Sequence, residues 1–180
     1  MTHSREEIIG FIGDHISQEL ADEIDAATDP QDGCAEVCEK DGYGTGKADA
    51  TTIALRTSRM PLWLCAVVMI HEYHHWQRAH AAGVSSGNPG EGDPETDDSN
   101  PCGKCNHAAM GGEDTALAGE LCEQLSVAER KQLCELAWEW RKKITKLLTQ
   151  CVYDGCMSCC GFGYVPNVDE IWSPPPCCVP

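Results

Sequence analysis

Residues 61–75 read PLWLCAVVMIHEYHH, and this stretch decides what fold and what chemistry the sequence can support. Its first ten residues are apolar on every side of a helix rather than along one stripe, which is the pattern of a helix buried in a core. Its last five residues bring histidines and a glutamate to the end of that helix. We expect a helix that begins near Pro61 and ends before Gly83, because proline favours a first helical position and glycine favours a stop.

The five residues from His71 to His75 match the pattern H-E-x-x-H. One helical turn separates His71 from His75, so both imidazoles project from one face and can hold a single zinc ion. Glu72 lies about 100° further around the helix, where its carboxylate can reach a metal-bound water and accept a proton. The pattern therefore predicts zinc ligation by the two histidines, with Glu72 as the catalytic base. The alternative is a run of surface histidines at the wet end of a core helix.

A zinc ion that keeps one position for water needs a third protein ligand. His80 follows the motif, but it is turned to the opposite side of the helix from the histidine pair. The extended pattern H-E-x-x-H-x-x-G-x-x-H also fails, since Arg78 and Ala81 replace its glycine and last histidine. The second route is a carboxylate from a later helix, for which Glu113 is the candidate and Glu120, on the same helix face, is the alternative.

Two further interpretations of this later segment stay open. Glu113 would do no more than complement the positive end of its helix if that helix began close by. His107 is another candidate ligand, ahead of Glu113 in a segment that contains several glycines.

The motif inside an apolar helix resembles the zincin metallopeptidases, and a carboxylate ligand from a later helix is the gluzincin arrangement. His107-Ala108 followed by Glu113-Asp114-Thr115-Ala116 is similar, more loosely, to one small zincin family, the mitochondrial intermembrane-space metallopeptidase that processes an ATP synthase subunit. In that family a His-Ala pair closely precedes Glu-x-x-Ala, and cysteines flank both motifs. The gap between the two motifs is longer here, and the resemblance covers less than a third of the chain. It implies a zinc peptidase with His71, His75 and Glu113 as ligands.

The chain has 180 residues and a formal charge of −16. A chain of this length can bury roughly 70% of its unfolded surface around one core. So large an excess of acid does not suit a phosphate backbone, so we expect no nucleic-acid partner. The apolar run at 61–70 is about half as long as a membrane span, so we expect no membrane insertion. A peptide or protein substrate is the partner that the motif implies, whereas the oligomeric state is unknown.

Thirteen cysteines are the second prominent feature, and their odd number excludes complete internal pairing. Cys65, inside the apolar helix, is expected to stay a small buried thiol. The other twelve could form six disulfides. The competing interpretation is additional structural zinc, because Cys102-x-x-Cys105 and Cys156-x-x-Cys159 have the spacing of zinc ligands.

Adjacent cysteines at 159–160 and 177–178 favour disulfides over zinc. Disulfides in turn favour an oxidising compartment, extracellular or periplasmic-like, although the N-terminus shows no apolar segment typical of a signal peptide. The localisation is otherwise unknown.

Hydrophobic periodicity predicts one packing helix over 4–27, a helix over 112–124, and a long helix from Ser126 to about 149. Residues 51–56 alternate in the manner of a strand. We therefore predict an α+β fold that is mostly helical, a small zincin-like domain with a short sheet and the H-E-x-x-H helix at its centre.

We place that domain at residues 1–150 and a Cys- and Pro-rich tail, packed on the same domain, at 151–180. The predicted function is a zinc-dependent endopeptidase. The alternative is a non-catalytic Cys-rich binding or effector module, or an inactive zincin relative, in which metal or disulfides only hold the fold.

Overall fold

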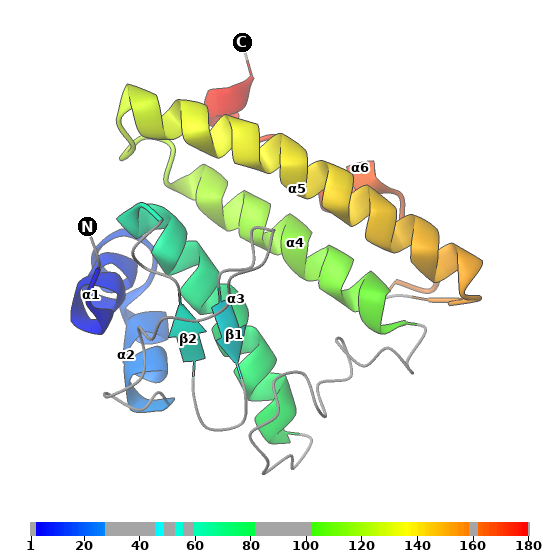
Figure 1. Cartoon of the computed structure of the whole chain (residues 1–180), viewed down its shortest axis with the longest axis horizontal. Coiled ribbons are helices and arrows are strands. Elements are labelled where there is room, and N and C mark those ends of the chain that lie inside the picture. The colour runs from blue at the N-terminus through cyan, green and yellow to red at the C-terminus, as the bar shows by residue number, and fades with distance from the viewer. Residues whose placement is uncertain are drawn as a thin grey trace. The chain divides into compact units, whose positions relative to one another are not determined.

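The chain divides into two compact units, Met1–Asp93 and Pro94–Pro180 (Figure 1). This division falls at 93/94, whereas the sequence analysis placed a boundary at 150/151. The computed structural model describes residues 3–27, 46–48, 53–55, 60–81, 102–158 and 162–179.

The first unit contains three helices and a pair of short strands. The elements are α1 (Arg5–His15), α2 (Gln18–Ala27), β1 (Gly46–Ala48), β2 (Ile53–Leu55) and α3 (Leu62–Ala81). The strands pair antiparallel, with Lys47 opposite Ala54. Among the described residues the strands form a sheet of two, β1-β2. The prediction of a mostly helical fold is confirmed, whereas the zincin-like α+β architecture stays a prediction.

The predicted helix over 4–27 is in fact two helices, α1 and α2, that break at Ile16 and Ser17. A capping box begins α1, in which the Ser4 hydroxyl accepts from the Glu7 N–H at 3.2 Å. The break has a local cause that periodicity alone does not reveal. The Ser17 hydroxyl accepts from the N–H of Leu20 at 3.2 Å, so Ser17 starts a new helix instead of continuing the first.

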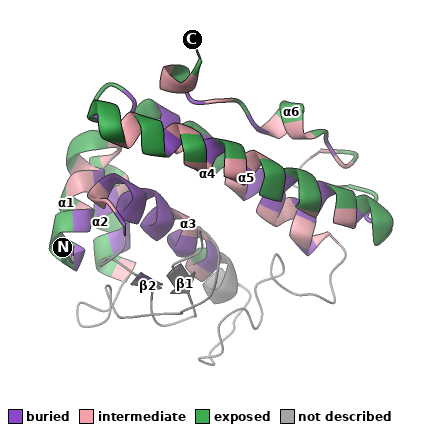
Figure 2. Cartoon of the chain, turned by 45° about the horizontal axis from the view of Figure 1, so that its top comes forward, coloured by how far each residue is buried: buried purple, intermediate pink, exposed green. Residues whose placement is uncertain are grey.

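Helix α3 is the core element of the first unit. Every residue from Trp63 to Ile70 is buried, as expected for a helix that is apolar on all sides (Figure 2). Helix α1 and both strands pack against α3, and α1 packs against α2. Within the described ranges, no helix combines the length and apolar character that crossing a membrane would require.

The second unit is built on an antiparallel helical pair, α4 (Gly103–Glu120) and α5 (Val127–Tyr153), which lie side by side in Figure 1. The short helix α6 (Val168–Ile171) and the 3-10 helix η2 (Pro176–Cys178) pack on this pair. The predicted start of the helix at Ser126 is confirmed, with a capping box there, and α5 runs a few residues past the predicted end. Its buried stripe recurs every three or four residues: Leu133, Ala137, Trp140, Ile144, Leu148 and Cys151.

Helix α4 corrects the prediction of a helix over 112–124, because it begins at Gly103 and ends at Glu120. Gly111 and Gly112, at the predicted start of this helix, lie in the interior of α4. A Cβ at Gly112 would collide with the carbonyl oxygen of Ile171, and one at Gly111 would lie 3.1 Å from Cγ1 of Ile144. These glycines therefore permit close approach of neighbouring segments, which offsets their low helix propensity.

Disulfides link α4, α5 and the chain next to them to the C-terminal part of the second unit. Among the described residues of this unit, seven cysteines are in disulfides: the pairs Cys102–Cys156, Cys122–Cys177 and Cys134–Cys178, and Cys105. The disulfide interpretation is confirmed for these residues. Both sulfurs of Cys102-x-x-Cys105 are oxidised, so this motif does not supply thiolates to a structural zinc ion.

Cys65 is a buried thiol, as predicted. The other twelve cysteines could have formed six disulfides, but Cys151 is also a buried thiol, so they do not all pair. Burial raises the pKa of Cys151, and the nearby charge of Asp154 adds to this effect. Cys151 lies on the buried stripe of α5, so it behaves as a small apolar core residue.

Replacing Gly112 with alanine is expected to destabilise the second unit by about 1–3 kcal/mol, because the added methyl overlaps the Ile171 carbonyl. Gly10→Ala is the matched control, since it lies within α1 with nothing inside 4 Å of its Cβ position. That control should gain about 0.5–1 kcal/mol from helix propensity. Chemical denaturation with the disulfides intact measures both changes, and equal effects of the two substitutions would contradict the close packing at Gly112.

Candidate metal centre

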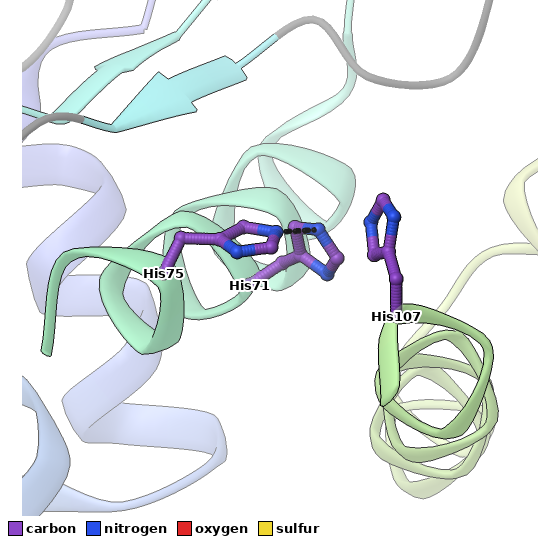
Figure 3. A group of neighbouring side chains, drawn as sticks. All are labelled: His71, His75 and His107. Carbon is purple, nitrogen blue, oxygen red and sulfur yellow. Dashed lines mark hydrogen bonds between the residues drawn. The ribbon is translucent and has the colours of Figure 1, made fainter. Parts of the chain in front are cut away.

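The two motif histidines lie next to each other on α3. Their Nε2 atoms are 3.0 Å apart, and the ring centroids are separated by 4.6 Å with the planes at 77°. Figure 3 shows the two rings edge to face, with the dashed line joining the nitrogens. The one-turn spacing predicted from the sequence therefore brings the two imidazole nitrogens together.

The distance between the two Nε2 atoms is close to the distance between two nitrogen ligands of one zinc ion. Zinc–nitrogen bonds of about 2.0–2.1 Å at a tetrahedral angle separate two ligand nitrogens by about 3.3 Å. The observed 3.0 Å needs only a small rotation of either ring to reach that value. The pair therefore has the donor type and the spacing of two zinc ligands.

Two polar residues of the motif are buried. Among the described residues, four polar or charged side chains are buried, and two of these are Glu72 at 6% and His75 at 8% exposure. The other two are Arg5 and Thr115. Arg5 forms an ion pair with Asp25 at 2.8 Å, and Thr115 donates to a carbonyl of its own helix. A buried carboxylate and a buried imidazole each need partners that offset their lost hydration, and a metal ion is one partner that an imidazole can have.

Tyr73 fixes the rotation of α3 about its axis. Its ring stacks on Trp76 with centroids 5.7 Å apart, and its hydroxyl lies 3.4 Å from a carboxylate oxygen of Glu23 on α2. Burial raises the pKa of Tyr73, and the negative charge of Glu23 raises it further. Because Tyr73 lies about 200° around the helix from His71, holding the tyrosine against α2 directs the histidine pair away from α2.

The predicted third ligands lie in the other unit. Glu113 and Glu120 are both exposed side chains of α4. Glu113 is the eleventh residue of that helix, so it does not complement the helix N-terminus, whose effect is confined to the first turn. His107, also drawn in Figure 3, is half-buried near the start of α4. The side chain of His80 lies outside the described residues.

A second group of neighbouring side chains, three cysteines that are in disulfides here, was not anticipated from the sequence. The sulfurs of Cys134, Cys177 and Cys178 all lie within 4.8 Å of one another. The C-x-x-C spacing suggested zinc ligands at other cysteines, in Cys102-x-x-Cys105 and Cys156-x-x-Cys159, whereas these three come from α5 and η2. The adjacent pair Cys177-Cys178 was the only available signal, and it carried no information about its partner on α5.

No protein-family model, no curated protein and no solved structure matches this chain. What can be said of the site therefore depends on its own residues.

Loss of either motif histidine should weaken zinc binding. We expect His71→Ala and His75→Ala each to lower zinc affinity by at least about 100-fold, more than loss of a residue that only supports a ligand. Competition with a chromophoric chelator measures the affinity under non-denaturing conditions. His15→Ala, at an exposed position of α1, is the control and should bind zinc as the parent does. Wild-type affinity in both motif variants would exclude this pair as the zinc site.

Proposed function

We propose that the protein is a zinc-dependent endopeptidase in which His71 and His75 hold the ion and Glu72 is the catalytic base. The observation that carries this proposal is the histidine pair, with Nε2 atoms 3.0 Å apart, on the same helix as a buried glutamate. The residue types, their order and their burial agree with metal-assisted hydrolysis of a peptide bond.

Bound zinc would lower the pKa of its water to about 7 and polarise the scissile carbonyl. Glu72 would accept the proton of the attacking water and then deliver it to the leaving amine. Its position suits both tasks, because it is adjacent to His71 and three residues from His75. The low exposure of Glu72 limits competing proton exchange with bulk water.

The strand pair suggests how an extended peptide would be held. Strands β1 and β2 each have one partner among the described strands, and β2 lies shortly before α3 in the chain and packs on it. We propose that a substrate adds to this sheet through main-chain hydrogen bonds, which favour an extended backbone without selecting strongly for side chains. The formal charge of −16 favours the approach of basic peptides.

The third ligand in this proposal comes from α4. The sequence favours Glu113, with Glu120 as the alternative, by analogy with gluzincins. Two observations now favour His107. Its side chain is half-buried whereas both glutamates are exposed, and the start of α4 is covalently anchored by Cys102 and Cys105. Imidazole is also a common zinc ligand at sites that keep one position open.

Single substitutions distinguish these candidates. We expect His107→Ala to reduce zinc affinity by at least about 10-fold, while Glu113→Ala and Glu120→Ala leave it unchanged. Zinc affinity and peptide cleavage should be measured on the same preparations, because a true ligand affects both. A loss confined to Glu113→Ala would restore the ligand set that the sequence suggested.

The decisive test of the proposed mechanism is Glu72→Gln. This substitution keeps the size of the side chain and removes its ability to accept a proton, so peptide cleavage should fall by at least about 1,000-fold. Bound zinc should stay near one equivalent per chain, which separates loss of the base from loss of the metal. Cleavage is measured by mass spectrometry on a diverse peptide library.

Glu19→Gln, at an exposed position of α2, is the matched control and should retain full cleavage. Cleavage by Glu72→Gln at the parent rate would rule out the mechanism.

A non-catalytic module is the second candidate, favoured by the disulfides that hold the second unit together. A domain that depends on covalent links for its shape can serve as a binding or effector module without any chemistry. Zinc bound by intact His71 and His75 with no cleavage of any library peptide would support this candidate, or an inactive zincin relative. In either case the disulfides fit an oxidising compartment.

A further inference from the structure

We propose that Cys122, Cys134, Cys177 and Cys178 form a second, structural metal site that binds one zinc ion when their two disulfides are reduced. This proposal is independent of the peptidase hypothesis, because all four cysteines belong to the second unit and none lies near the H-E-x-x-H motif in the chain.

The four sulfurs come from three segments that meet at one end of the α4–α5 pair. Cys122 follows the end of α4, Cys134 is in α5, and the adjacent pair is in η2. Disulfides join Cys122 to Cys177 and Cys134 to Cys178, with Cα–Cα distances of 5.7 and 5.3 Å. Because the two disulfides share a pair of adjacent residues, they lie next to each other, and three of their four sulfurs are within 4.8 Å of one another.

The spacing of these sulfurs suits a tetrahedral zinc site. Zinc–sulfur bonds of about 2.3 Å place the four sulfurs of such a site about 3.8 Å from one another. The sulfurs of Cys134, Cys177 and Cys178 already lie within 4.8 Å of each other, and Cys122 is bonded to one of them. Breaking the two S–S bonds would need only small side-chain rotations to reach the tetrahedral spacing.

The backbone around these cysteines is held by contacts that reduction does not remove. Leu121 and Leu125 in the connection between α4 and α5, and Leu133 of α5, are buried, with exposures of 0%, 6% and 0%. Gly119 of α4 packs closely against the C-terminal segment, since a Cβ there would lie 3.2 Å from Cδ of Pro176. These contacts keep Cys122, Cys134 and η2 near one another even in the absence of the S–S bonds.

A backbone donor already faces one of the sulfurs. The N–H of Cys177 points at Sγ of Cys122, 3.3 Å away, and the N–H of Cys178 closes the 3-10 turn on the carbonyl of Pro175 at 2.8 Å. An N–H aimed at a thiolate stabilises its negative charge and favours the deprotonated form that binds metal. The turn also directs the side chains of Cys177 and Cys178 toward different partners, Cys122 and Cys134.

The chemistry balances with a dithiol reductant. Two dithiol molecules transfer four electrons and four protons to the two disulfides, which gives four cysteine thiols and two oxidised reductant molecules. Binding of one zinc ion by the four thiols then releases four protons, because zinc binds thiolates. Four thiolates fill the tetrahedron and leave no position for water, so this site would be structural rather than catalytic. It would hold the C-terminal segment on α4 and α5 under reducing conditions, as the disulfides do under oxidising ones.

Cobalt(II) is the probe for this site, used on the full chain carrying His71→Ala and His75→Ala so that the first site does not contribute. After reduction, this background should bind cobalt with the intense sulfur-to-metal charge-transfer bands and the tetrahedral d–d bands of four thiolate ligands. Zinc should displace the cobalt at one equivalent and raise the thermal stability of the reduced protein. The oxidised protein should show no such bands.

Two disulfide deletions in this background make a matched pair. Cys122→Ser with Cys177→Ser should abolish the four-thiolate spectrum, whereas Cys102→Ser with Cys156→Ser should retain it, although the two disulfides close loops of nearly equal length, 55 and 54 residues. Persistence of the four-thiolate spectrum in the first variant, or its absence from the reduced parent background, would overturn the proposal.

A conservative substitution covers the case in which the first variant does not fold. Cys134→His should keep one equivalent of bound cobalt while shifting the d–d bands to those of three sulfurs and one nitrogen. An unchanged spectrum would exclude Cys134 as a ligand and with it the proposed site.

Discussion

The first unit depends on burial of the apolar surface of α3. Eight consecutive residues, from Trp63 to Ile70, are removed from water, and complete burial of a single large apolar side chain contributes about 1.5–3 kcal/mol. A helix that is apolar all round must be covered on all sides, which requires α1 and the strands to pack around it. The motif begins at the next residue, His71, so the same packing that stabilises the unit also determines where the histidines and Glu72 lie. Site and core are consecutive turns of one helix.

The second unit is stabilised in a different way, by a helical pair and covalent links. Helix α5 contributes a regular buried stripe to this unit. Glycines of α4 let the C-terminal segment around Ile171 and Pro175 approach that helix closely. The C-terminal segment has short elements with few buried side chains, and it packs closely against Gly119 of α4. The bonds from Cys122 and Cys134 to η2 add covalent links to this packing. Linking distant positions in this way stabilises mainly by restricting the unfolded chain.

The features that the sequence could predict are those set by residues close together in the chain. Both capping boxes and the stripe of α5 follow from spacings of three or four residues, and so does the proximity of His71 to His75. The errors have a common origin. The glycines at 111–112 are helix breakers by propensity, and only the nearby Ile144 and Ile171 make them suitable for a helix interior. Cys151 could equally have been paired, and only its position on the buried stripe of α5 identifies it as a core thiol.

The same distinction explains why the pair of candidate ligands on α3 is better defined than the proposed third ligand. The geometry of two residues on one helix is set by the helical repeat, whatever surrounds it. A third ligand from another element depends on how two elements pack, and this information is spread over many side chains of both. The candidates for a third ligand differ in hydration. An exposed carboxylate is fully solvated, and it loses that hydration on binding a metal. A half-buried imidazole such as His107 has already lost part of its hydration, so binding metal costs it less. On this argument burial, rather than similarity to a carboxylate motif, is the better guide to the ligand that completes the site.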